Sequence, residues 1–146
     1  ISEDVVVPRS KIPQMVARIG EIGESLGLGT CAFGHAGDGN LHVQVLFDEE
    51  EEMDRVQKAI DQIFAETLKL GGTITGEHGV GVEKLDAMCF QYSDAELDVF
   101  HQIKAAFDPQ TLLNPGKAEP SLHRCAELGN MHVHHGNLPH PELERF

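Results

Sequence analysis

Hydrophobic residues recur at two different spacings in the first half of the chain, and these spacings predict alternating strands and helices. An apolar run at residues 5–7 ends at Pro8, which predicts a short strand. Apolar residues then recur every three or four positions over residues 12–26 and again over 53–67, as on one face of a helix. Glycines follow both stripes and favour helix ends there.

Between the two helical stripes, the pattern predicts a β-hairpin. Two strand-like runs, residues 30–35 and 41–47, flank Asp38-Gly39, a pair that favours a two-residue type I′ turn. Centring the turn on this pair places His35 directly opposite His42. Directly opposed residues of an antiparallel pair share one face, with Cβ atoms roughly 4.5–5.5 Å apart.

The second run of the hairpin alternates strictly between apolar and polar residues. Alternation of period two points successive side chains to opposite faces of a sheet, and the apolar face packs against the helices. His42 and Gln44 belong to the polar set, whereas the apolar set is Leu41, Val43, Val45 and Phe47. We therefore expect both histidines on the face of the sheet that the helices leave open.

A further short strand at residues 73–75, with Ile74 inward, completes a β-α-β-β-α-β order. This order is typical of the ferredoxin-like fold, so we expect an α+β chain whose antiparallel sheet carries its helices on one face. Ser93 and Glu96 form a capping box that begins a later helix, which Asp108-Pro109 ends. The expected domains are 1–80, the ferredoxin-like domain; 81–118, a small helical segment; and 119–146, a His-rich tail.

The composition narrows the functional classes. The chain has 146 residues, 40% of them hydrophobic, and a net charge of −13, which argues against a nucleic-acid partner. No apolar run is long enough for a transmembrane helix. The three cysteines lack CxxC spacing, which favours a reducing compartment without a disulfide framework. The chain begins at Ile1 and not at Met, and a strand-like run follows almost at once, at residues 5–7. We interpret the chain as a fragment of a longer protein or as a processed chain.

A second histidine-bearing stretch, Gly76-Glu77-His78-Gly79, makes a metal site plausible. A site formed by His35, His42 and Glu77 would have nitrogen and oxygen ligands that suit Zn²⁺ and leave Mn²⁺ and Fe²⁺ open. Three protein ligands leave a position for a substrate hydroxyl, and His78 beside the third ligand is placed to act as a general base. The alternatives are two unrelated histidines near a turn and a glycine-rich turn whose His78 only satisfies a neighbour.

A difficulty accompanies this hypothesis. In the ferredoxin-like topology the last strand runs parallel to residues 41–47, so its end would lie at the sheet edge opposite the hairpin turn. Glu77 reaches the histidines only if that strand is short or displaced, or if further strands alter the sheet. The tail carries five more histidines: His123, His132, His134, His135 and His140. A His-rich tract can form a metal site, but this spacing matches no common ligand pattern, and we interpret the tail as a solvated or partner-facing segment.

Three motifs together resemble the C-terminal domain of FAD-linked 2-hydroxy-acid oxidases, a family that includes glycolate oxidase, D-lactate dehydrogenases and D-2-hydroxyglutarate dehydrogenase. The motifs are residues 34–42 (GHAGDGNLH), residues 72–81 (GTITGEHGVG), and Phe107-Asp108-Pro109 with residues 113–117 (LNPGK). The tail, with residues 122–127 (LHRCAE) and 131–136 (MHVHHG), is similar to that of the bacterial glycolate oxidase branch of this family.

The resemblance implies a metal held by His35, His42 and Glu77, with His78 taking the substrate hydroxyl proton while hydride passes to flavin. It implies that Gln44 occupies a substrate-contacting position, where relatives have Asn, and that the loop containing Asn114 returns to an FAD-binding domain. FAD would be bound mainly by that absent domain, so the fragment alone should be inactive.

The resemblance also implies a small 2-hydroxy-acid substrate and partner subunits that include an iron–sulfur protein. The expected location is cytoplasmic, or peripheral at the inner membrane. The alternative is a non-enzymatic ferredoxin-like module that binds metal or regulates a partner.

Overall fold

The structure is a computed structural model of the chain that describes residues 1–120. It divides into two compact units, Ile1–Gly79 and a second unit that begins at Val80, and each is described by itself. The five histidines of the predicted tail lie outside the described residues, so the interpretation of that tail stays a prediction.

The first unit is a three-stranded antiparallel sheet with two long helices. The strands are β1 (Ser2–Val6), β2 (Gly29–His35) and β3 (Asn40–Leu46), in the spatial order β1-β3-β2. The helices are α1 (Ile12–Leu26), preceded by the short 3₁₀ turn η1 (Arg9–Lys11), and α2 (Met53–Lys69), preceded by η2 (Glu50–Glu52). The predicted α+β fold is confirmed.

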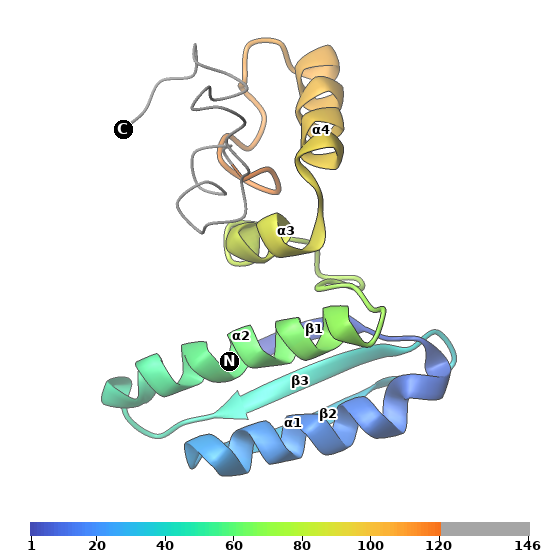
Figure 1. The fold of residues 1–146 in the computed structure, drawn as a ribbon. Helices are drawn as coiled ribbons and strands as arrows, with labels where there is room; N and C mark the ends of the chain where they lie inside the picture. The colour runs from blue at the N-terminus through green and yellow to red at the C-terminus, as the bar shows by residue number, and fades with distance from the viewer. Residues whose placement is uncertain (121–146) are drawn as a thin grey trace, which may run out of the picture. The chain divides into compact units, whose positions relative to one another are not determined.

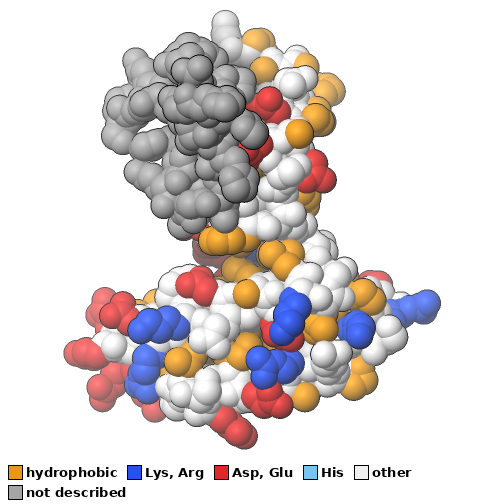
Figure 2. Space-filling view, viewed as in Figure 1, with side chains coloured by type: hydrophobic (Ala, Val, Ile, Leu, Met, Phe, Trp, Pro, Cys, Tyr) orange, Lys and Arg blue, Asp and Glu red, His pale blue; other side chains and the backbone are white. Residues whose placement is uncertain are grey.

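Both long helices pack against the same face of this sheet, as Figure 1 shows. The apolar alternation of β3 faces them, since Leu41, Val43 and Val45 are all buried. The helices contribute the other side of the core with Met15, Ile19, Ile22, Val56, Ile60 and Ile63. The outer surface of α1 and α2 carries mixed acidic and basic side chains (Figure 2). The opposite face of the sheet has no helix of this unit on it.

The hairpin between β2 and β3 differs from the predicted two-residue turn. His35 pairs with Asn40 and His42 pairs with Phe33, so a four-residue loop joins the strands. The carbonyl oxygen of His35 accepts from the N–H groups of Asp38 (3.3 Å) and Gly39 (3.1 Å), and Asp38 Oδ1 accepts from the N–H of Asn40 (3.1 Å). Only Gly39 of the Asp38-Gly39 pair has a positive φ, +87°, and a type I′ turn needs two such residues.

Gly39 is therefore expected to tolerate no side chain. A Cβ atom there would lie 2.0 Å from the carbonyl oxygen of Val7, in addition to the strain of a left-handed backbone. We expect Gly39→Ala to lower the free energy of unfolding by about 2 kcal/mol or more, measured by urea titration followed through the amide signals of β3. The matched variant Gly37→Ala meets no atom within 4 Å and should leave the midpoint nearly unchanged; equal effects of the two variants would contradict this account.

The predicted fourth strand is reduced to one β-bridge. Thr73 pairs with Val6 through two backbone hydrogen bonds of 2.8 and 3.0 Å, and no ladder follows it. Ile74 is fully buried, as its inward position requires. Residues 75–79 are thus not part of the sheet, which changes where Glu77 lies.

The second unit contains α3 (Leu85–Gln91) and α4 (Asp94–Phe107). The capping box of Ser93 and Glu96 begins α4 as predicted, whereas α3 has no counterpart in the sequence analysis. Of the apolar stripe along α4, Leu97 is buried but Ile103 and Phe107 are exposed. No helix in residues 1–120 combines the length and apolar character that crossing a membrane requires.

Two of the three cysteines, Cys31 and Cys89, lie within the described residues. Cys31 is exposed and carries a free thiol. Cys89 is disulfide-bonded. Cys125 lies outside the described residues.

Candidate metal centre

The open face of the sheet brings His35, His42 and Glu77 together. Both histidines lie on this face although the register differs from the predicted one, because the difference is two residues. A shift by an even number of residues keeps every side chain on its face, whereas a shift by one would have separated the histidines. The two rings meet edge to face with centroids 5.5 Å apart.

The three side chains present ligand atoms at one point. Glu77 Oε1 lies 2.9 Å from His42 Nε2 and 3.6 Å from His35 Nε2, and one ligand atom from each residue falls within 4.8 Å of the others. Two atoms bound to one tetrahedral ion at about 2.0–2.1 Å lie about 3.3 Å apart. The donor set and its spacing are therefore compatible with a divalent metal ion.

Glu77 reaches the histidines because the chain leaves the sheet after Thr73. Continued antiparallel pairing from Val6 and Thr73 would place Glu77 opposite Ser2, at the far end of β1. Instead residues 76–78 turn over the carboxylate of Asp4. Asp4 is the residue of β1 that lies opposite His42 of β3 in the sheet. A complete fourth strand would have carried Glu77 away from the histidines, but the pairing ends at Thr73.

His78 adjoins this group of three. Its ring stacks on that of His42, with centroids 5.1 Å apart and an angle of 24° between the planes. Its Nδ1 lies 3.8 Å from Asp4 Oδ1, and half of the side chain is exposed. The ring is thus fixed on one side and open to solvent on the other, an arrangement that suits a group that exchanges a proton with a bound molecule.

Gln44 and Phe33 also lie on the open face. Gln44 follows His42 on the polar side of β3, but its Nε2 donates to Ser2 Oγ at 3.0 Å, away from the three ligands. Phe33 pairs with His42 across the hairpin, with ring centroids 5.4 Å apart, and is 55% exposed. Phe33 is absent from the site predicted from the sequence, because the predicted two-residue turn gave His42 a different partner.

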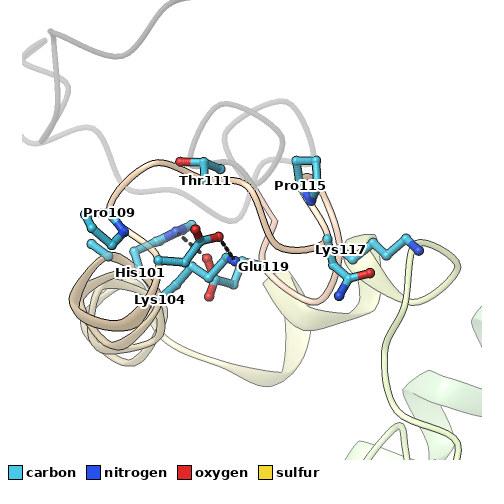
Figure 3. A pocket seen from close by; sticks show the side chains of 11 residues that line it. His101, Lys104, Pro109, Thr111, Pro115, Lys117 and Glu119 are labelled. Carbon is cyan, nitrogen blue, oxygen red and sulfur yellow. Dashed lines mark hydrogen bonds and ion pairs between the residues drawn. The ribbon is translucent and has the colours of Figure 1, made fainter.

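Asn114 lies in the second unit, at a pocket of about 360 Å³ formed by the end of α4 and the loop after it. Figure 3 shows His101, Lys104 and Glu119 on one side of this pocket and Pro115 and Lys117 on the other. Asn114 has a left-handed backbone, φ +47°, within the turn that precedes Gly116. The structure places Asn114 beside a pocket, and its role toward a cofactor stays a prediction.

The loop of this pocket is held by Asp108. Its carboxylate accepts from the N–H groups of Leu112 (2.9 Å) and Leu113 (2.8 Å) and from Lys104 Nζ (2.5 Å). The hydrogen bond from Lys104, followed by that from Leu113, holds the pKa of Asp108 below its usual value. The loop is therefore anchored by a carboxylate that stays charged at neutral pH.

Comparison with known proteins places the chain in one family. Residues 1–118 match the family described as FAD linked oxidases, C-terminal domain. The chain is 48% identical over 145 residues to glycolate oxidase subunit GlcD of Escherichia coli K12, covering 98% of this chain and 29% of that protein. It is 47% identical over 119 residues to GlcD of Bacillus subtilis, covering 80% and 25% of the two chains.

A D-lactate dehydrogenase of Archaeoglobus fulgidus is 37% identical over 121 residues, which cover 82% of this chain and 26% of that enzyme. The chain thus spans less than a third of the length of these relatives. The resemblance inferred from the three motifs is confirmed. The family match and these identities show that the chain belongs to the FAD linked oxidases, as a C-terminal domain of that family.

Proposed function

We propose that this chain is the substrate-facing part of an FAD-dependent oxidoreductase that converts a small 2-hydroxy acid to the 2-oxo acid. The observation that carries the proposal is the convergence of His35, His42 and Glu77 on one point, with His78 stacked beside it. Glycolate oxidase and D-lactate dehydrogenase, the named activities of the relatives, both act on 2-hydroxy acids, which supports this substrate class.

His35, His42 and Glu77 would hold a divalent ion, with Zn²⁺, Mn²⁺ and Fe²⁺ all compatible with the ligand types. Such an ion supplies Lewis acidity to a hydroxyl or carboxylate oxygen. Only three ligands come from this chain, which leaves room for a substrate oxygen. The half-exposed side chain of Glu77 and the exposed ring of His35 leave that room on the solvent side.

His78 would accept the hydroxyl proton of the substrate. Its Nδ1 faces the Asp4 carboxylate, so Nε2 is the ring atom left for this transfer. FAD would supply the hydride acceptor for the hydrogen on the α-carbon. The loss of one proton and one hydride turns the C–OH group into C=O. Gln44, on the same face as His42, would contact the substrate, and Asn114 in the second unit would contact the cofactor.

The complete protein would act within a multi-subunit complex. Two of the relatives are named as subunits of glycolate oxidase, and we propose partner subunits that include an iron–sulfur protein as the next electron carrier. We place the complex in the cytoplasm or peripherally at the inner membrane. The 146-residue chain by itself should not turn over, because the greater part of the family's length lies outside it.

The test uses the full-length protein that contains this chain. It should purify with FAD, and glycolate, D-lactate or D-2-hydroxyglutarate, added without oxygen, should bleach the flavin absorbance within seconds. Succinate, which has no hydroxyl group, is the control and should not. A protein that purifies without flavin, or flavin that no 2-hydroxy acid reduces, would favour a non-enzymatic metal-binding or regulatory module instead.

A further inference from the structure

We infer that Asp4 is the positioning residue of the candidate centre: its carboxylate takes the place of a fourth strand and holds Glu77 and His78 over the imidazoles of His35 and His42. The inference rests on the proposed function for what the centre does. The anchoring itself is read from contacts within Ile1–Gly79.

Asp4 binds three successive backbone N–H groups from the other end of this unit. Its Oδ2 accepts from Gly76 at 2.7 Å, Glu77 at 2.6 Å and His78 at 3.0 Å, and Thr75 Oγ1 lies 3.4 Å from Oδ1. These donors are separated from Asp4 by more than 70 residues in sequence. A single carboxylate therefore fixes the segment that carries both functional side chains.

Burial makes this anchor specific for a carboxylate. Asp4 is fully buried, and a buried charge is tolerated only when it is paired and hydrogen-bonded. Taking a carboxylate out of water is costly. The three N–H groups offset this cost, since hydrogen bonds to an ionised acceptor are roughly twice as strong as neutral ones.

Gly76 allows the close approach that this geometry needs. A Cβ atom at this residue would lie 2.5 Å from Asn40 Oδ1 and 2.8 Å from a methyl group of Val6. The backbone at Gly76 can thus lie flat against β1 and β3, within reach of Asp4. Without the carboxylate nothing in the β-ladder holds this segment, because pairing ends at Thr73.

If Asp4 only stabilised the fold, its replacement would lower stability without changing metal binding by His35, His42 and Glu77. Asp108 provides the matched control for this distinction. It is also a buried carboxylate that accepts two successive backbone N–H groups, but it lies in the second unit. The variants Asp4→Asn and Asp108→Asn would be compared in the 146-residue chain. Zn²⁺ binding is followed through the imidazole NMR signals of His35 and His42, so that ions held elsewhere do not contribute.

We expect Asp4→Asn to weaken Zn²⁺ binding at these imidazoles by about 10–100-fold, and Asp108→Asn to leave it unchanged. Wild-type affinity in folded Asp4→Asn, or equal losses in both variants, would overturn the inference.

Amide hydrogen exchange supplies a readout that needs neither metal nor activity. In the wild-type chain the N–H groups of Gly76, Glu77 and His78 should be protected relative to Gly37, whose loop is exposed, and Asp4→Asn should remove this protection. If the variant does not fold, unprotected amides at residues 76–78 of the wild type would still refute the anchor. If the wild type binds no Zn²⁺ at His35 and His42, the proposed metal site is refuted. The exchange data still decide whether Asp4 anchors residues 76–78.

Discussion

Replacing His78 by alanine should lower the rate of flavin reduction by the 2-hydroxy acid by about 10²–10⁴-fold in the full-length protein, with FAD still bound. The reason is that His78 is the basic side chain stacked on the candidate ligand His42 with a ring atom open to solvent. Stopped-flow absorbance of the flavin under anaerobic conditions measures the rate, and the resting spectrum reports whether FAD remains bound.

Added imidazole gives this experiment its control. A small base that fits the space left in His78→Ala should restore part of the rate, whereas it should not accelerate the wild type. A variant with an unchanged rate would remove His78 from the mechanism. A variant that loses its FAD would show that the side chain acts on cofactor binding instead.

Replacing His42 by alanine should lower the affinity for Zn²⁺ by more than about 100-fold, because the loss of a direct ligand exceeds the 10–100-fold effect of an outer partner. His42 is the least exposed of the three ligands, with 13% of its side chain accessible, and it is nearest to Glu77. Calorimetric titration of the 146-residue chain measures the affinity.

His101→Ala is the matched control for this variant. His101 also lies beside a carboxylate, with Nδ1 3.3 Å from Glu119, but it belongs to the second unit and to no group of three ligands among the described residues. Its loss should not change Zn²⁺ affinity. An equal loss in the two variants would indicate that the ion binds elsewhere.

The positions of the two histidines on one face could be predicted although the turn could not. The face on which a side chain lies changes only when the pairing register shifts by an odd number of residues. The alternation of apolar and polar residues along β3 excludes such a shift. The loop depends on local hydrogen bonds of Asp38 and on φ at a single glycine, and the Asp-Gly pair is compatible with more than one turn. The sequence thus predicted which side chains share a face but not which are directly opposed.

The arrival of Glu77 at this face could not be predicted, because it depends on a contact between residues more than 70 positions apart. Asp4 stands beside the apolar run of β1, and no local pattern distinguishes it from an ordinary exposed acid. Its role follows only from the pairing of β1 with β3, which sets it opposite His42. The exposed residues of α4 show a similar limit, since a helical stripe identifies an apolar face but not what covers it.

Anomalous diffraction from crystals of the protein loaded with Zn²⁺ tests most directly whether His35, His42 and Glu77 form one metal centre. We expect a single peak at the zinc edge within bonding distance, about 2.0–2.2 Å, of Nε2 of both histidines and of a carboxylate oxygen of Glu77. No peak at this point, or an ion bound to one of these residues alone, would contradict the account.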